Sequence, residues 1–156
     1  MAINNMDNYD GFYGQEPRLP MPKGEVAGEV KVLRDTYTLA AAFALNDELD
    51  MGFVPEGSTI IDCKVIIPAS VGATGIFTVG YRAFVDSDGN TVSEDADALI
   101  LSADAGGQAV FARMLAGVAG YGKKVGKGGA QIFATCTEVV GATGGQITIE
   151  VQYVND

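Results

Sequence analysis

Residues 58–68, STIIDCKVIIP, decide the fold class of this chain. The run is rich in β-branched side chains, and successive residues of an extended chain point to opposite faces. One predicted face is wholly apolar: Ile61, Cys63, Val65 and Ile67. The other face is half polar: Ile60, Asp62, Lys64 and Ile66. Pro68 ends the run because proline cannot donate to a sheet ladder. The stretch therefore predicts a strand with a buried side.

Further segments of the same kind lie on both sides of this strand. They are VKVLRDTYTL at 30–39, IFTVGYRAFV at 76–85, QIFATCTEVV at 131–140 and QITIEVQYV at 146–154. VPEGS at 54–58 is typical of a turn, and GATGG at 141–145 predicts a hairpin between the last two strands. The crossover helices of a parallel sheet are missing, so the pattern favours an antiparallel β-sandwich.

Short helices are expected at one or two places. SEDADALIL at 93–101 has a helix-start pattern, with Ser93 as the N-cap and acidic residues in the first turn. The segment at 40–52, AAAFALNDELDMG, is consistent with a short helix or with strand and turn. The segment at 109–120 is consistent with a strand or a helix, and the glycine-rich residues 120–129 predict a loop.

The charge balance argues against nucleic acid as a partner. Twenty acidic residues oppose ten basic ones, which gives a net charge of −10, and such a chain repels phosphate backbones. Lys123, Lys124 and Lys127 form the only basic cluster of the sequence, and their glycine-rich surroundings indicate a solvated loop.

Cysteine use and hydropathy define the expected compartment. Cys63 and Cys136 stand far apart in apolar runs, which favours two buried free thiols over a bridge between neighbouring strands. The first residues, MAINNMDNYDGF, lack the pattern of a secretion signal, and no apolar run reaches the ~20 residues that a membrane span requires. We therefore expect cytoplasmic synthesis and no membrane partner.

The residue inventory makes enzymatic chemistry improbable. The chain of 156 residues contains no histidine, which excludes triads that use this base. The acidic groups at 47–50 and 94–97 are typical of solvated faces. Residues 86–90, DSDGN, resemble the start of a calcium loop but lack its full ligand spacing, so a turn is favoured. We predict no catalytic residue, no metal and no cofactor.

Residues 1–27 differ from the rest and predict an extended N-terminal arm, with residues 28–156 forming the β-sandwich domain. Pro17, Pro20 and Pro22 interrupt regular structure. Yet Tyr9, Phe12, Tyr13, Leu19 and Met21 supply spaced apolar anchors, and large aromatic side chains carry much of the binding energy at interfaces. A docking arm is favoured over a frayed tail.

Two stretches carry a resemblance to a known family. TYTLAAAFALNDELDMGFVPEGSTIIDCKVIIP, and VGYRAF with the DADALIL segment that follows, are similar to recurring phrases of tailed-bacteriophage head decoration proteins, also called capsid cement proteins. The resemblance covers about residues 30–104. It implies a jelly-roll-like sandwich on the outer surface of the virion, where it binds and bridges major capsid protein subunits and associates with copies of itself, a trimer being favoured over a dimer.

The arm would supply part of that capsid contact. The candidate contact residues are Tyr9, Phe12, Tyr13, Leu19, Pro20 and Pro22. The alternative within the virion is a head-fibre base, a tail-fibre adaptor or a receptor-binding knob. A receptor-binding module is expected to present aromatic side chains on its loops, and outside the arm Tyr121 is the exception in this chain. A lectin-like binding module on a sandwich is a further alternative.

Overall fold

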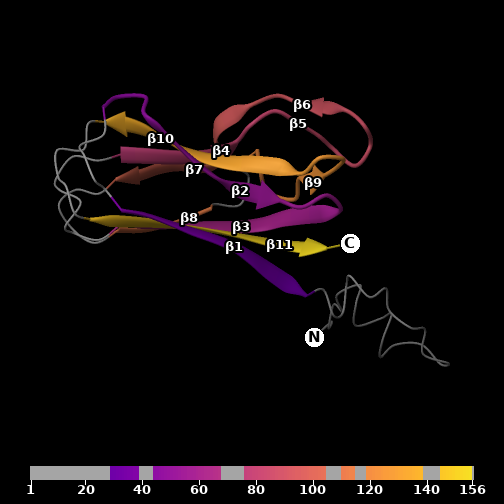
Figure 1. The fold of residues 1–156 in the computed structure, drawn as a ribbon, viewed down its shortest axis with the longest axis horizontal. Coiled ribbons are helices and arrows are strands. Elements are labelled where there is room, and N and C mark those ends of the chain that lie inside the picture. Colours follow the sequence, from indigo (N-terminus) through magenta and orange to yellow (C-terminus); the bar gives the residue numbers. More distant parts are fainter. Residues whose placement is uncertain are drawn as a thin grey trace, which may run out of the picture.

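The computed structural model describes residues 29–38, 44–67, 76–104, 110–114, 119–138 and 145–155. Within these ranges the regular structure is entirely β, in agreement with the predicted class (Figure 1). The strands are β1 (Val30–Thr38), β2 (Glu48–Val54), β3 (Ser58–Ile67), β4 (Ile76–Tyr81), β5 (Phe84–Val85), β6 (Thr91–Val92), β7 (Asp95–Asp104), β8 (Val110–Arg113), β9 (Lys124–Val125), β10 (Ala130–Glu138) and β11 (Gln146–Asn155).

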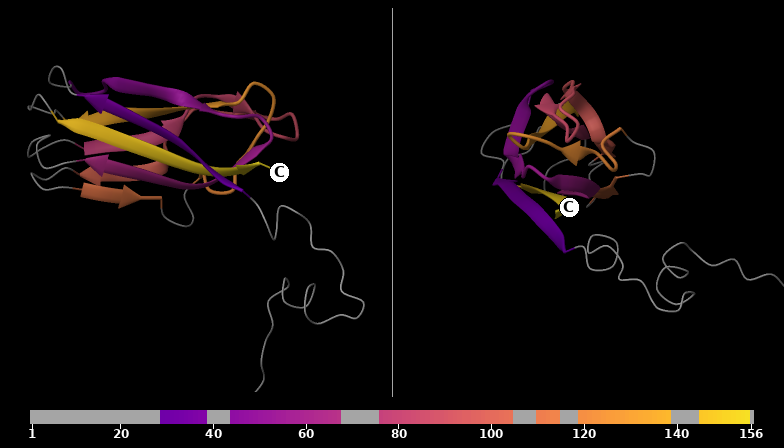
Figure 2. Two further views of the ribbon diagram at one scale, coloured as in Figure 1. Left: turned by 60° about the horizontal axis from the view of Figure 1, so that its bottom comes forward. Right: turned by 90° about the vertical axis from the view of Figure 1, so that its right-hand side faces the viewer.

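The longer strands form two antiparallel sheets stacked in two layers (Figures 1 and 2). The first sheet has the order β1-β11-β3-β8, with β9 also pairing to β3, and the second has the order β2-β10-β4-β7. The short β5–β6 pair projects from one end, beside β9. This arrangement confirms the predicted antiparallel sandwich.

The strand order is jelly-roll-like. Among the eight longer strands, the first pairs with the last, the second with the next to last, and so on inward: β1 with β11, β2 with β10, β3 with β8, and β4 with β7. Folding a long double ribbon over on itself gives this pattern and distributes the strands between two sheets. Because most partners are far apart in sequence, the fold depends on long-range pairing.

The core lies between the inner faces of the two sheets. Strand β3 contributes Cys63, Val65 and Ile67 to it, as the alternation predicts. A bulge opposite Gln152 and Tyr153 shifts the register between Ile60 and Asp62. Such an extra residue re-aims the side chains that follow it. As a result Ile60, and not Ile61, is fully buried with the inner face.

The remaining core residues also follow the predicted alternation of β4 and β11. Phe77, Val79 and Tyr81 of β4 are buried, as are Ile147, Ile149 and Val151 of β11. Tyr81 packs edge-on against Phe84, with ring centroids 5.1 Å apart. The predicted free thiols are confirmed, because Cys63 and Cys136 are both buried and neither forms a disulfide.

The helix expected at residues 93–101 is wrong. Residues 95–104 form the ten-residue strand β7, which pairs with β4. Local helix-start signals are worth only about 1 kcal/mol, and tertiary pairing overrides them. The register shifts twice along this pair, so three consecutive residues, Ala98, Leu99 and Ile100, are all buried. That irregularity removed the period-two signal of a strand.

The hairpin expected between residues 131–140 and 146–154 is also wrong. Strands β10 and β11 are successive, yet they belong to different sheets: β10 pairs with β2 and β4, and β11 with β1 and β3. A connection that crosses between sheets carries the same glycines as a tight turn, so composition did not separate the two. The predicted strand at 76–85 divides into β4 and β5, with Arg82 and Ala83 between them.

Each of the two ambiguous segments contains a strand. Residues 48–54 form β2 and residues 110–113 form β8. The turn at 54–58 is confirmed, with Gly57 at a positive φ of 75°. The predicted loop at 120–129 contains the two-residue strand β9. The predicted arm, residues 1–27, lies outside the described residues.

Candidate interaction surface

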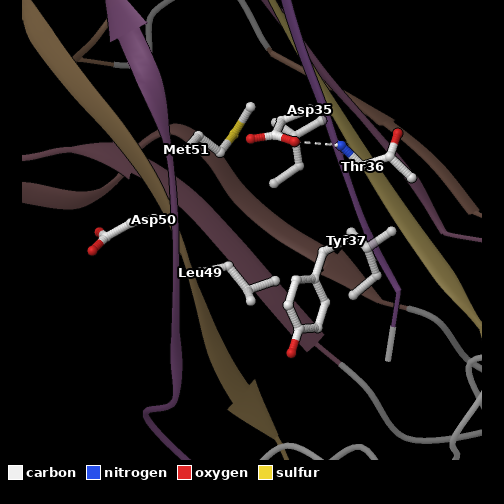
Figure 3. A pocket seen from close by; sticks show the side chains of 8 residues that line it. Asp35, Thr36, Tyr37, Leu49, Asp50 and Met51 are labelled. Atoms are coloured by element: carbon white, nitrogen blue, oxygen red, sulfur yellow. Dashed lines mark hydrogen bonds between the residues drawn. The ribbon is translucent and has the colours of Figure 1, made fainter. Parts of the chain in front are cut away.

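The two edge strands β1 and β2 lie along the same side of the sandwich and form a shallow groove (Figure 3). Asp35, Thr36 and Tyr37 line it from β1, Leu49, Asp50 and Met51 from β2, and the core residues Ile147 and Ile149 from β11. Tyr37 and Leu49 point toward one another, whereas Asp50 turns away (Figure 3). The groove holds about 60 Å³. That volume suits a few methylene groups and is far below the ~300 Å³ of a small-molecule site.

Strand β1 is the most exposed long strand of the structure. Seven of its nine residues are exposed, although it pairs with β11 along its whole length. Within the described ranges, no strand pairs with its other edge. The Thr36 amide donates a 2.8 Å hydrogen bond to the Asp35 carboxylate, which occupies one donor of that edge (Figure 3). An exposed strand edge is a template for pairing with another chain.

The opposite side of the sandwich is closed by the chain itself. There the Gly120 amide donates to Ala98 of β7, at 2.8 Å. The Gly122 amide donates to Ile60 of β3, at 2.9 Å, and the Ile60 amide donates in turn to Lys123, at 3.0 Å. This segment therefore joins the two sheets through backbone hydrogen bonds. Among the described residues no segment joins β1 to β2 in this way, and we call the β1–β2 side the open side.

The open side is held together at one point by close packing. A Cβ atom on Gly52 would lie 3.0 Å from Leu33 Cδ1, so the Leu33 side chain rests against the bare backbone of β2. On the outer face, Arg34 forms a 3.4 Å ion pair with Glu150, and the Thr36 and Thr148 hydroxyls lie 3.0 Å apart. These contacts fix β1 on β11 and keep its free edge in one place.

The outer face of the second sheet is organised by one cation, Arg82. Its guanidinium reaches Glu48 at 2.7 Å and Asp50 at 2.8 Å, both on β2, and Glu94 at 3.4 Å. The hydrogen bonds to Glu48 and Asp50 raise the pKa of Arg82 above its usual value. The guanidinium also lies 3.9 Å from the centroid of the fully buried Phe133 ring. Arg82 thus links β2 and the segment that contains Glu94 to Phe133, in the middle of the sheet.

The acidic groups that the sequence assigned to solvated faces meet at this cation. Nearby, a side-chain hydrogen bond with Asp95 raises the pKa of Asp97, which is exposed. In the part of the chain described, no group of three or more cysteine and acidic side chains is arranged to hold a metal ion. Over the same residues, no helix is long and apolar enough to cross a membrane.

Residues 86–90 form the turn that the sequence favoured over a calcium loop. Asp86 Oδ1 accepts hydrogen bonds from the amides of Asp88, at 3.0 Å, and Asn90, at 2.8 Å. The bond from the Asn90 amide is the main cause that lowers the pKa of Asp86. Its carboxylate therefore stabilises its own backbone turn.

Both free thiols are buried in the core. Burial, reinforced by the Asp62 carboxylate, raises the pKa of the Cys63 thiol far above its usual value. The Cys136 thiol donates to the carbonyl of Glu138 at 2.8 Å. A thiol held protonated inside a core is unreactive.

The sequence-predicted contact residues lie outside the described part of the chain. They are Tyr9, Phe12, Tyr13, Leu19, Pro20 and Pro22. The structure instead brings out the free edge of β1 and the Arg82 cluster, neither of which sequence reasoning singled out. Alternation placed Val30, Val32 and Arg34 on one face of β1 without showing that β1 is an edge. Tyr121, the predicted loop aromatic, is 57% exposed.

Comparison with solved structures gives three chains of the same fold. A chain from the capsid of Ralstonia phage GP4 matches with a TM-score of 0.62 at 20% identity, covering 88% of this chain and 90% of that one. A chain from the cyanophage Pam1 capsid asymmetric unit gives 0.57 at 17%, covering 89% and 94%. A chain from the acid-stable capsid of Helicobacter pylori bacteriophage KHP30 gives 0.51 at 11%, covering 80% and 86%.

These likenesses establish a shared fold over nearly the whole length of each chain. No model of a known protein family matches the sequence, and neither does any curated protein.

Proposed function

We propose that this chain is a structural protein of a phage virion that binds the outside of the capsid and bridges neighbouring major capsid protein subunits. One observation carries the proposal: three chains with this fold, each matched over at least 86% of its own length, come from phage capsid structures. At 11–20% identity the sequences have diverged widely while the sandwich persists. The sequence resemblance to decoration proteins supports the finer assignment.

The architecture suits a role that depends on contact. A sandwich presents two rigid outer faces and one open edge, and it can lie against a shell without a reactive group. Weak contacts repeated over a lattice add up when each copy engages several subunits. We therefore assign no enzymatic activity and no cofactor. The resemblance adds that copies associate with one another on the capsid.

The arm supplies the second half of the proposal. Residues 1–27 come before β1 in the sequence, and in this proposal the arm is joined to the body at that edge strand. Tyr9, Phe12 and Tyr13 are the aromatic anchors that an interface uses, and Leu19, Pro20 and Pro22 extend the apolar contact. In this proposal the body sets the position and the arm provides much of the affinity.

Binding to heads tests both parts. Purified chain is added to expanded heads that lack it, and the bound copies are counted against concentration. Saturable binding is expected. Replacing Tyr9, Phe12 and Tyr13 together with serine is expected to weaken binding at least about tenfold, because buried aromatic anchors each contribute roughly 1–2 kcal/mol. Replacing Asn4 and Asn5 with serine is the matched control and should leave binding unchanged.

Deletion of residues 1–27 separates the arm from the body. The truncated chain should retain the far-ultraviolet circular dichroism of a β-sandwich and lose most of its head binding. Full decoration by the truncated chain would show that the arm is dispensable. Failure of the intact chain to bind heads, together with binding to tail fibres or glycans, would favour the adaptor or receptor-binding alternatives.

A further inference from the structure

We propose that the free edge of β1 pairs antiparallel with β1 of a second copy, in the register that places Leu33 of each copy opposite the other on a two-fold axis. The first sheets of the two copies then join into one continuous sheet. The inference concerns contact between copies and does not depend on capsid binding.

The backbone direction of β1 sets which residues face the free edge. In an antiparallel strand, alternate residues direct both backbone groups to the same neighbour. The Thr36 amide donates to its own neighbour Asp35 and so is not part of the ladder with β11. The even-numbered residues therefore present their backbone groups to the free edge: Val30, Val32, Arg34, Thr36 and Thr38. A partner strand must pair even-numbered residues with even-numbered residues.

Charge favours one register over its neighbours among those that this rule allows. With Leu33 on the axis, Lys31 of each copy lies opposite Asp35 of the other, which gives two attractive pairs. An axis at Arg34 places Arg34 against itself, and an axis at Asp35 places Asp35 against itself. An axis one step earlier, at Val32, sets Glu29 against Asp35. Like charges directly opposite one another destabilise a strand pair, so these three registers are disfavoured.

The chosen register also completes the hydrogen bonding of the edge. Val32 pairs with Arg34 of the second copy, and Val30 pairs with Thr36, each twice by symmetry, for about eight backbone hydrogen bonds. Val30 and Val32, which are 50% and 51% exposed in one copy, each gain a cross-strand neighbour. Thr36 exchanges its local acceptor, Asp35, for the partner's Val30 carbonyl, which releases the Asp35 carboxylate for the partner's Lys31.

The groove between β1 and β2 provides room for that lysine. Asp35 lines the groove, whose floor is apolar and whose volume is about 60 Å³. A lysine side chain lays its methylene stem along apolar surface while its ammonium group stays in water. The partner's Lys31 fits this description, with its stem near Met51 and its ammonium group at Asp35. The groove is thus too small for a ligand and suited to one side chain.

The oligomeric state of the full chain tests the pairing, measured by sedimentation equilibrium up to about 100 µM, since a small interface associates weakly. A monomer–dimer equilibrium is expected. Lys31→Asp turns both attractive pairs into repulsive ones and should weaken dimerisation at least about tenfold. Asp35→Lys should do the same, and the double exchange Lys31→Asp with Asp35→Lys should restore the dimer. Lys124→Asp, on β9, is the charge-matched control and should leave it unchanged.

A second variant tests the backbone pairing without altering charge. Val32→Pro removes a donor from the free edge only, and proline is tolerated on an edge strand when its missing amide would face solvent. The variant should fold, by circular dichroism, and remain monomeric. A chain that is monomeric at the highest concentration overturns the proposal. So does an oligomer of any size that survives Val32→Pro, or a double exchange that fails to restore association. Head binding, measured separately, tells this failure from failure of the proposed function.

Discussion

Replacing Arg82 with methionine should destabilise the fold well beyond the usual effect of a surface substitution. Methionine keeps an apolar stem over Phe133 but removes the charge that joins β2 to the segments around β4 and β7. The two shortest contacts, 2.7 Å to Glu48 and 2.8 Å to Asp50, are lost, as is the 3.4 Å contact to Glu94. Three carboxylates then remain near one another without the cation between them.

The magnitude follows from the exposure of the site. The Arg82 side chain is 25% exposed, so each short charge-assisted bond contributes about 0.5–1 kcal/mol, less than in a buried pair. The cation over the Phe133 ring adds about 0.5–1 kcal/mol. The total is about 2 kcal/mol. With a urea dependence of about 2 kcal/mol per molar for a domain of this size, the unfolding midpoint should fall by about 1 M.

Urea unfolding followed by circular dichroism measures this shift. Arg34→Met is the matched control, because Arg34 makes one 3.4 Å ion pair and its side chain is 62% exposed. Exposed pairs of that kind contribute about 0–0.5 kcal/mol, so the control should move the midpoint by less than about 0.25 M. Adding 1 M salt, which screens charges over about 3 Å, should narrow the gap between wild type and Arg82→Met. Equal shifts for the two variants would refute the assigned role of Arg82.

Two further substitutions test local features of the sandwich. Gly80→Ala should destabilise the protein by about 2–3 kcal/mol in the same urea assay, because its new methyl group would collide with the backbone of Asp95. Gly57→Ala, where the space is open and only the positive φ is strained, should cost about 1 kcal/mol, and an equal cost would contradict the collision. Asp86→Ala should speed hydrogen exchange at the Asn90 amide. In the wild type, folding lowers the pKa of Asp86 below its ordinary value of 3.8. The protection of the Asn90 amide is therefore complete above pH 3.8, and it is lost only as the pH falls through the lower folded-state pKa. Exchange at the Asn90 amide that is as slow in Asp86→Ala as in the wild type would show that the carboxylate does not hold the turn.

The sequence was informative wherever one strand face is buried and the other is not. Residues 63–67 and 146–151 alternate cleanly, and both belong to long central strands of the first sheet. The alternation failed at Ile61 because a bulge consumed one residue there. It failed over 95–104 because two register shifts buried three consecutive residues. The position of a bulge depends on the partner strand, and the sequence of one strand does not show which strand pairs with it.

Topology and surface roles were less predictable for the same reason. The pairing of β1 with β11 joins residues more than 100 positions apart, so no local pattern indicated it. Lys31 and Asp35 are available to pair with a second copy only because β1 is an edge strand. Arg82 forms its ion pairs only because the fold brings β2 and residue 94 beside it. The resemblance of residues 30–104 to decoration proteins did anticipate the sandwich, and the matched chains from phage capsid structures share this fold over most of the chain.

The place of this chain in the virion tests the central claim most directly. A density map of the intact phage at a resolution that resolves strands should contain the sandwich on the outer surface of the capsid, in contact with more than one major capsid subunit. Density for the sandwich at the tail, or a complete map of the particle that has no place for it, would contradict the account.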